Sequence, residues 1–407
     1  EPGLWSLDNF GEVLIATIAN GKTFSWNAGI AARFTTRAST STTSFETTNA
    51  PTATRVSMIS PTTRHVLMFG TETTIGTAST QDDMFIRFSN QEEINVYAPT
   101  AENSAGSQRL QDGTKIMGAL KAKDNILVWT DTALYTMKFV GSPFTFGFEQ
   151  VGTNCGLIGK NAVIEIDGIA FWMSAKGFFL FDGTVKSLAC SVEDYVYNDI
   201  DTTKGQQINA GVNNLFTEVT WYYPTLGADF NDRSVSYNYG ESTKLPGGVW
   251  YTSSEGRTSW MNAKIYPNPF ALKYDSSATG TFPSVTGETG LGQSTYYEHE
   301  VGVDQINPDG TTTAITSSLE SYDFDLDLQG QGEFFLSIRR FIPDFKTLTG
   351  NATVTFNLKR FPSDTATAST FSPFTVTSST QKFNTRARGR FASLKIANLT
   401  SAEDWRF

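Results

Sequence analysis

The chain has 407 residues, of which 39% are apolar and 13% aromatic, so it has ample material for one large hydrophobic core or two to three ordinary ones. A net charge of −10 and a pI near 4.9 argue against a nucleic-acid-binding protein, because binding to phosphates needs clustered lysine and arginine. No apolar run approaches the ~20 residues of a membrane span, and we recognise no signal peptide. Because the chain starts at Glu1 and stops abruptly at Phe407, we expect it to be part of a longer polypeptide.

The composition favours strands. The 31 Phe and 14 Tyr are strand formers, and the 34 Gly and 14 Pro interrupt the chain at short intervals. Helical periodicity is nearly absent, and apolar runs of four to eight residues alternate with turn signals instead. We therefore predict an all-β protein.

The first predicted hairpin is Glu12–Asn27, because Ala19-Asn20-Gly21 supplies the positive φ that a tight turn requires. Further strands follow at short intervals. They are expected in Arg64–Gly70, Met84–Tyr97, Asn125–Val140, Asn161–Val185, Leu215–Pro224, Arg233–Gly240, 247–254, 269–276 and 296–302.

These strand groups recur every 40 to 60 residues, a spacing typical of propeller blades. We predict a β-propeller of five to six blades over residues 1–303, although no WD or kelch signature marks it, and a long β-sandwich array would give similar spacing. Residues 304–318 read as a polar connector. Residues 319–407 have longer, cleanly alternating strands and are predicted to form a C-terminal antiparallel domain of β-sandwich type.

The aromatic side chains of Gly168–Leu188 could line a ligand pocket or form part of a hydrophobic core. Its strand places Ile169, Phe171 and Met173 on one face. The other face receives Trp172 between two small residues. Because both faces carry bulk, we interpret the stretch as part of a blade packed between two others.

An acidic strip, Asp323, Asp325 and Asp327, resembles the start of a calcium loop. An EF-hand needs Gly at position 6 and Glu at position 12, where this chain has Leu328 and Phe334, so the match fails. The better interpretation is a strand that alternates outward carboxylates with inward apolar residues, the latter being Phe324, Leu326 and Leu328.

A basic strip of alternating Arg386, Arg388 and Arg390 mirrors the acidic one. We expect cross-strand pairing between the two strips, each exposed pair contributing only ~0.2–1 kcal/mol. A phosphate-binding arginine strip is the alternative.

The sequence offers little catalytic chemistry. Glu218 lies near Trp221, Tyr222 and Tyr223, a grouping that glycosidase clefts also show, but glycoside hydrolysis needs a second carboxylate and no Asp-box turn is present. A strand residue paired with Arg or Lys is the simpler expectation for Glu218.

Neither His65 nor His299 has neighbouring residues at the spacing of a metal site or of a Ser/His/Asp triad. Cys155 and Cys190 are expected to be small buried residues rather than a disulfide. We predict no catalytic, cofactor-binding or metal-binding residue.

Several stretches together, in order, suggest a family. They are LWSLDNFGEVLIA (Leu4–Ala16), NILVWTDTALYTMKFVG (Asn125–Gly141), FWMSAKGFFLFDGTVKSLAC (Phe171–Cys190), the two parts of Asn213–Tyr239, YYEHEVGVD (Tyr296–Asp304), RRFIPDF (Arg339–Phe345), TRARGR (Thr385–Arg390) and the terminal DWRF. In this order they resemble the tail hub or nozzle proteins of short-tailed bacteriophages. The chain departs from that pattern in long Ser/Thr-rich loops, Thr35–Thr54 and Ser276–Thr289, which leaves the attachment partner open.

The resemblance implies a non-enzymatic virion protein, assembled in the host cytoplasm as a ring of usually six copies. The ring would lie below a portal-proximal adaptor, carry fibre or spike proteins, and let DNA pass without specific binding. Since an acidic wall repels phosphates, we expect much of the negative charge to face the lumen. Two alternatives remain: a carbohydrate-binding or carbohydrate-active propeller that uses Trp221 and Tyr222 as sugar platforms, and a secreted adhesin.

Overall fold

The computed structural model describes residues 4–27, 50–242, 247–263, 266–275, 293–307, 309–326, 334–368 and 373–406. The Ser/Thr-rich residues 35–49 and 276–289 lie outside this part of the chain. The fold is all-β, as predicted: strands dominate, and the described helices are one short α-helix, α1 (Glu193–Asp199), with two 3₁₀ turns at Ala78–Thr80 and Thr202–Gln207. The chain divides into two compact units, Glu1–His299 and Glu300–Phe407.

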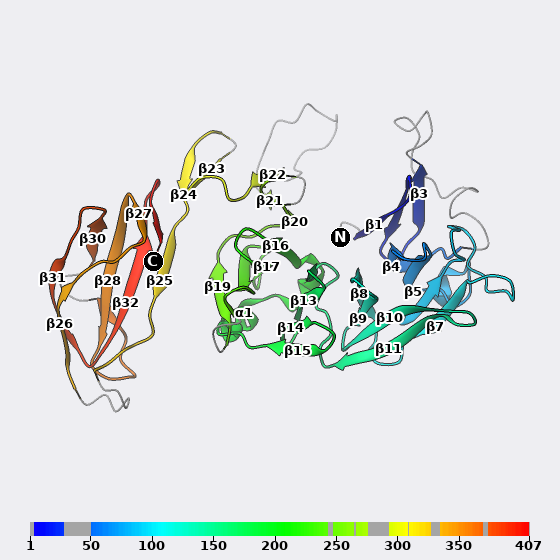
Figure 1. Ribbon diagram of the computed structural model, residues 1–407, viewed down its shortest axis with the longest axis horizontal. Helices are drawn as coiled ribbons and strands as arrows, with labels where there is room; N and C mark the ends of the chain where they lie inside the picture. The colour runs from blue at the N-terminus through cyan, green and yellow to red at the C-terminus, as the bar shows by residue number, and fades with distance from the viewer. Residues whose placement is uncertain are drawn as a thin grey trace. The chain divides into compact units, whose positions relative to one another are not determined.

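The N-terminal unit consists of six antiparallel sheets that follow one another along the chain, each with its strands in sequential order (Figure 1). The first three sheets are β1 (Trp5–Phe10), β2 (Val13–Ile18) and β3 (Thr23–Asn27); β4 (Thr54–Ile59), β5 (Val66–Thr71), β6 (Phe85–Phe88) and β7 (Gly106–Arg109); and β8 (Ile116–Lys121), β9 (Ile126–Thr130), β10 (Ala133–Gly141) and β11 (Thr145–Thr153). The next three are β12 (Val163–Ile166), β13 (Ile169–Ser174), β14 (Gly177–Phe181) and β15 (Val185–Leu188); β16 (Asn209–Asn213), β17 (Glu218–Tyr223), β18 (Arg233–Asn238) and β19 (Val249–Ser253); and β20 (Ser259–Met261), β21 (Phe270–Asp275) and β22 (Gln293–Glu298).

Contacts between the sheets follow the blade order of a β-propeller. The first strands of successive sheets touch one another, β4 to β8, β8 to β12, β12 to β16 and β16 to β20, and β1 also lies against β4. Meanders that meet through their first strands are the arrangement that radial repetition produces. The predicted propeller is therefore confirmed, with six sheets in the described residues.

Polar side chains on β1 tie it to several other sheets. The Asp8 carboxylate accepts a hydrogen bond from the Ile59 backbone N–H, 2.7 Å away, and pairs with Lys121 Nζ at 2.5 Å. Lys160, just before β12, donates to the Trp5 carbonyl and to Ser6 Oγ, both at 2.7 Å. Burial lowers the pKa of Lys160 to about 8. β1 is thus held by β4, β8 and the segment that leads into β12.

The predicted blade packing of Gly168–Leu188 is confirmed. Trp172 is fully buried, stacks on Phe179 with ring centroids 5.7 Å apart and meets Trp129 of the preceding sheet at 5.4 Å. Phe178 packs against Trp221 of the following sheet at 5.0 Å. These rings form part of one continuous apolar cluster through three sheets, so the stretch is core and not a pocket.

Most predicted hairpins are present, and Asn20 has the expected positive φ of 59°. The segment Met84–Tyr97 differs, because only Phe85–Phe88 is strand. The remainder is irregular and ends at Tyr97. This side chain is fully buried in an apolar cluster, although its segment forms no strand hydrogen bonds.

The C-terminal unit is an antiparallel β domain, as predicted. Its main sheet has the order β25 (Ser317–Glu320), β32 (Phe391–Asn398), β28 (Asn351–Lys359) and β29 (Thr367–Ala368), with β30 (Phe374–Thr377) also pairing with β28. The two-stranded sheets are β23 (Asp304–Ile306) with β24 (Thr312–Ala314), β26 (Leu336–Phe341) with β31 (Phe383–Gly389), and β27 (Thr347–Thr349) with β33 (Asp404–Arg406). Phe341 and Phe383 of the β26–β31 sheet pack on a small core that includes Val354 and Ile396. The segment 304–318, predicted as a connector, contains the β23–β24 hairpin and the start of β25.

Candidate interaction surface

The aromatic residues proposed as sugar platforms are buried, so that interpretation is wrong. The Trp221 indole N–H donates to the Ala162 carbonyl at 3.0 Å, and Tyr222 stacks on Trp260 with ring centroids 5.7 Å apart. Neither side chain is accessible to a sugar, because β17 lies inside its sheet and other sheets cover both of its faces. Glu218 accepts a hydrogen bond from the Tyr251 hydroxyl at 2.6 Å. Partial desolvation of the Tyr251 hydroxyl, together with this carboxylate, raises the pKa of Tyr251, although the side chain as a whole is 44% exposed.

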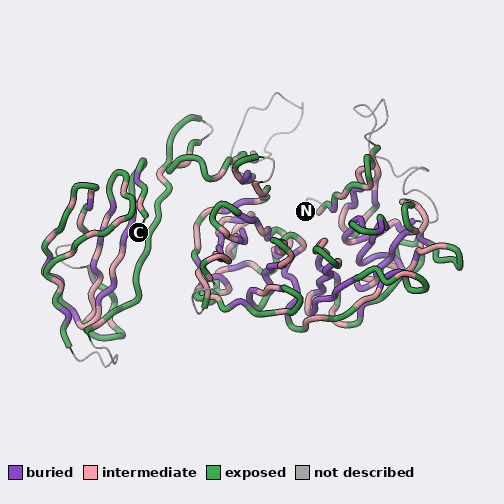
Figure 2. The backbone as a smooth tube through the Cα atoms, viewed as in Figure 1, coloured by how far each residue is buried: buried purple, intermediate pink, exposed green. Residues whose placement is uncertain are grey.

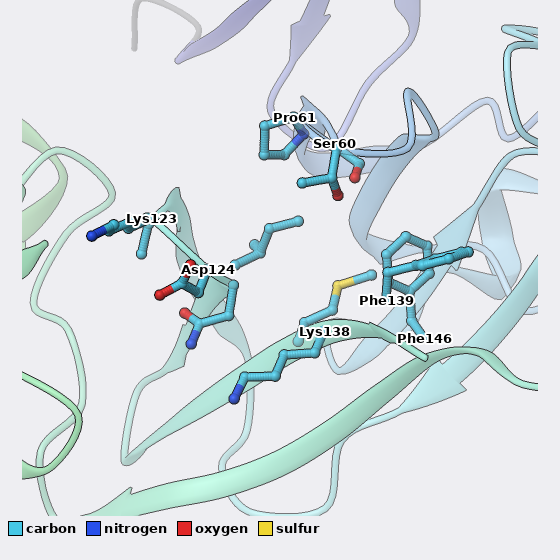
Figure 3. A pocket seen from close by; sticks show the side chains of 12 residues that line it. Ser60, Pro61, Lys123, Asp124, Lys138, Phe139 and Phe146 are labelled. Atoms are coloured by element: carbon cyan, nitrogen blue, oxygen red, sulfur yellow. The ribbon is translucent and has the colours of Figure 1, made fainter. Parts of the chain in front are cut away.

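A small pocket lies between the Ser60–Thr62 loop and the third sheet (Figure 3). Phe139 and Phe146 form one side of it, and the ammonium ends of Lys123 and Lys138 point away from Ser60 and Pro61. Asp124 is the one carboxylate in its lining. Since glycoside hydrolysis needs two carboxylates, the pocket does not provide that chemistry.

Both histidines are structural. His65 is fully buried, with Nδ1 2.8 Å from Thr63 Oγ1 and Nε2 3.0 Å from Ser104 Oγ. Burial lowers its pKa to about 4. His299 Nε2 accepts from Arg257 Nε at 3.0 Å, and burial with the neighbouring guanidinium lowers the pKa of His299 to about 4 as well. Neutral, hydrogen-bonded imidazoles of this kind are packing residues.

The two cysteines are unpaired, as predicted, and burial raises the pKa of both Cys155 and Cys190 to about 11. In the described part of the chain, no three His, Cys, Asp or Glu side chains gather in a way that would hold a metal ion. Within the same residues, no helix combines the length and hydropathy needed to cross a membrane.

The acidic strip does not form the predicted strand. Phe324 makes a single bridge to Ala392, and the side chains expected inward are open to solvent, Phe324 being 40% and Leu326 61% exposed. The segment passes along an edge of the main sheet, and among the described residues these side chains are not covered by another layer. Asp323 pairs with Lys359 at 2.7 Å rather than with the basic strip. Asp325 is half-buried, and Asp327 and Leu328 lie outside the described residues.

The basic strip does lie on a strand, and its alternation is clear. On β31, Thr385, Ala387 and Gly389 are buried, whereas Arg386 and Arg388 are exposed. Arg390 belongs elsewhere: it is half-buried, and its guanidinium lies over the Phe361 ring at 5.7 Å. Two of the three predicted arginines therefore share one open face.

The neighbouring strand adds two more arginines to this face. The register between β26 and β31 shifts between Ile338 and Arg340, and both Arg339 and Arg340 are exposed. We call Arg339, Arg340, Arg386 and Arg388 the arginine face. Among the residues that the structure describes, none of the four forms an ion pair. Arg339 and Arg340 are adjacent in the sequence, and strict strand alternation would turn one of them toward the core. Because an arginine is rarely buried, this dipeptide was the available sequence signal that both side chains reach solvent.

The comparisons with known proteins leave the family open. No protein-family model matches the chain, and no curated protein matches it. Solved structures that are similar in part include the computationally designed Ika8 protein (9% identity, TM-score 0.38, covering 65% of this chain and 66% of that one) and BamB from Moraxella catarrhalis (13%, 0.31, 66% and 78%). An ancestral GH74 enzyme is similar at 9% identity and TM-score 0.35, covering 73% of this chain and 48% of its own. At such scores these similarities carry no argument about what the chain does.

Proposed function

We propose that the chain is a structural subunit of a ring-forming assembly, the tail hub or nozzle of a short-tailed bacteriophage, and not an enzyme. The observation that carries this proposal is the segment 300–326, which is exposed almost throughout its described residues (Figure 2). It presents eight large apolar side chains to solvent: Val301, Val303, Ile306, Ile315, Leu319, Tyr322, Phe324 and Leu326. Many exposed large apolar side chains within one segment are typical of an interaction site, so the segment is expected to be covered by other subunits.

The contrast between the two units supports the same proposal. Of the 27 exposed large apolar side chains in the described residues, 13 lie in Glu300–Phe407, although this unit has only about a quarter of the chain. Its core cluster is also small, with four fully buried members. A domain with so little core and so much exposed apolar surface gains stability from a partner.

The proposal includes the partners that the sequence resemblance implies. The assembled ring, of about six copies on this resemblance, would join a portal-proximal adaptor, carry fibres or spikes, and surround the path of the exiting DNA. The negative charge of the chain suits such a conduit, because carboxylates along the wall repel phosphates and let the duplex slide.

The test is the assembly state of the purified chain, by light scattering after size-exclusion chromatography and by electron microscopy. We expect a closed ring with an axial channel wide enough for duplex DNA and a wall that is not strongly basic. A monodisperse monomer at every concentration would overturn the proposal. A glycan array serves as the second arm: specific glycan binding, or hydrolysis lost in Glu218→Gln, would favour a carbohydrate-directed role instead.

A further inference from the structure

We propose that the arginine face of the C-terminal unit binds the acidic N-terminal unit of a second copy of this chain. This inference rests on the proposed ring, and it names the surface through which one subunit grips the next. The exposed apolar residues of 300–326 would contribute buried surface to such a contact. The arginine face would determine which surface of the neighbouring copy is bound.

The charges of the two units are complementary. Residues 300–407 contain 11 of the 31 Lys and Arg and 12 of the 41 Asp and Glu, leaving 20 and 29 for residues 1–299. The N-terminal unit therefore has a net charge of −9 and the C-terminal unit −1. Four arginines that form no ion pair among the described residues lie on one face of the nearly neutral unit, and every neighbouring copy offers a strongly acidic unit.

A contact between different surfaces of identical subunits is heterologous, and it closes into a ring when the rotation between subunits allows it. The arginine face and the acidic unit are two such different surfaces. Like charges would meet if two acidic units faced each other. Charge thus disfavours a pair in which two acidic units face each other, and it favours a contact between the arginine face and an acidic unit.

The surroundings of the arginine face fit a protein partner better than DNA. Phe334, Phe335 and Ile342 flank it and are 62%, 53% and 65% exposed. The Arg388 guanidinium lies over the Phe335 ring, 5.3 Å from its centre. Arginine and aromatic side chains together are enriched in the energetic centres of protein interfaces. A duplex would also approach a chain whose net charge repels it.

The test compares two double charge reversals in the full chain. Arg386→Glu/Arg388→Glu alters the arginine face, and Lys346→Glu/Arg406→Glu makes the same change in charge at exposed cations beside the β27–β33 pair. We expect the first to raise the subunit dissociation constant at least about tenfold and the second to change it little. Circular dichroism checks that both variants fold, and Arg386→Gln/Arg388→Gln serves if the reversal does not.

A salt titration of the unaltered ring gives an independent readout. We expect dissociation to increase between 0.05 and about 0.5 M salt, because added ions screen the arginine–carboxylate attraction. Equal weakening by both reversals, or none by either, would overturn the inference and leave the ring proposal standing. A monomeric unaltered chain would overturn both.

DNA binding provides the last discriminating measurement. Fluorescence anisotropy with a labelled duplex at 0.15 M salt is expected to show no binding that depends on Arg386 and Arg388. Binding lost in the Arg386→Glu/Arg388→Glu variant while its ring stays intact would assign the arginine face to nucleic acid and overturn the inference.

Discussion

The indole N–H of Trp221 on β17 donates a hydrogen bond to the carbonyl oxygen of Ala162, which lies just before β12 in the preceding sheet. The same device recurs between other sheets. Trp172 donates to the carbonyl of Cys155 at 2.8 Å, and Trp260 donates to that of Val212 at 3.1 Å. A tryptophan in one sheet thus reaches back to the backbone at or beside the sheet before it, which fixes the spacing of neighbouring blades.

Trp221→Phe is expected to destabilise the N-terminal unit by about 2 kcal/mol, since it removes a buried hydrogen bond and leaves a partly unfilled space among Phe178 and Trp250. Equilibrium unfolding in urea measures the change. Trp5→Phe, at an exposed position of β1, is the matched control and is expected to have little effect. An equal decrease in the free energy of unfolding in both variants would show that the hydrogen bond from Trp221 to Ala162 has no special role.

The two histidines predict a loss of stability in acid. Each has a folded-state pKa of about 4, below the usual value of 6.5, so the unfolded chain binds more protons between these pH values. Stability is therefore expected to be complete above pH 6.5 and to fall as the pH drops toward 4, by at most about 3 kcal/mol for the fully buried His65. Urea midpoints at pH 7 and 4.5 measure this. His65→Gln is expected to flatten the dependence, and an unchanged slope in that variant would contradict the assignment.

Asp8→Asn is expected to loosen β1. The amide oxygen can still accept from the Ile59 N–H, but the ion pair to Lys121 is lost, which costs about 1 kcal/mol. Hydrogen exchange of the β1 amides is the sensitive readout and is expected to accelerate. Asp124→Asn, in the exposed β8–β9 turn, is the control. Faster exchange in the control alone would refute the role given to Asp8.

The exposed segment 300–326 predicts a selective protease pattern. It contains no Lys or Arg but presents Leu319, Tyr322 and Phe324 to solvent. Chymotrypsin is therefore expected to cut the free subunit here, whereas trypsin is not, and ring formation is expected to protect the site. Mass spectrometry of the fragments before and after assembly tests this, and equal cleavage of both forms would show that the segment is not covered in the ring.

Much of the fold could be predicted because strand and turn signals are local. Asn20 marks the first hairpin turn, and the three strands of Asn161–Val185 appear where the alternation places them. Short strands such as Thr54–Ile59 and Ile116–Lys121 were missed, since they lie close to turn-rich segments and depend on contacts with neighbouring sheets.

The candidate surfaces were harder to predict, because burial depends on distant layers. Trp221 looks the same in sequence whether it lines a cleft or fills a core. Alternation around Phe324 indicated two faces, but it could not show that no second layer covers the inner one. Arg386 and Arg388 were found because the layer behind their strand is present.

The register shift between β26 and β31 shows what a single extra residue can do to a surface, because two residues of β31, Thr385 and Arg386, lie opposite one residue of β26, Arg339. In a regular strand, a run of two arginines would expose one charge and bury or strain the other. The irregularity after Ile338 lets both side chains reach solvent while Phe341 still returns to the core. One extra residue in β31 therefore lets the neighbouring strand β26 present two charges instead of one without moving the sheet behind it, so an insertion or deletion at this point of β31 would tune subunit affinity in steps while the fold stays the same.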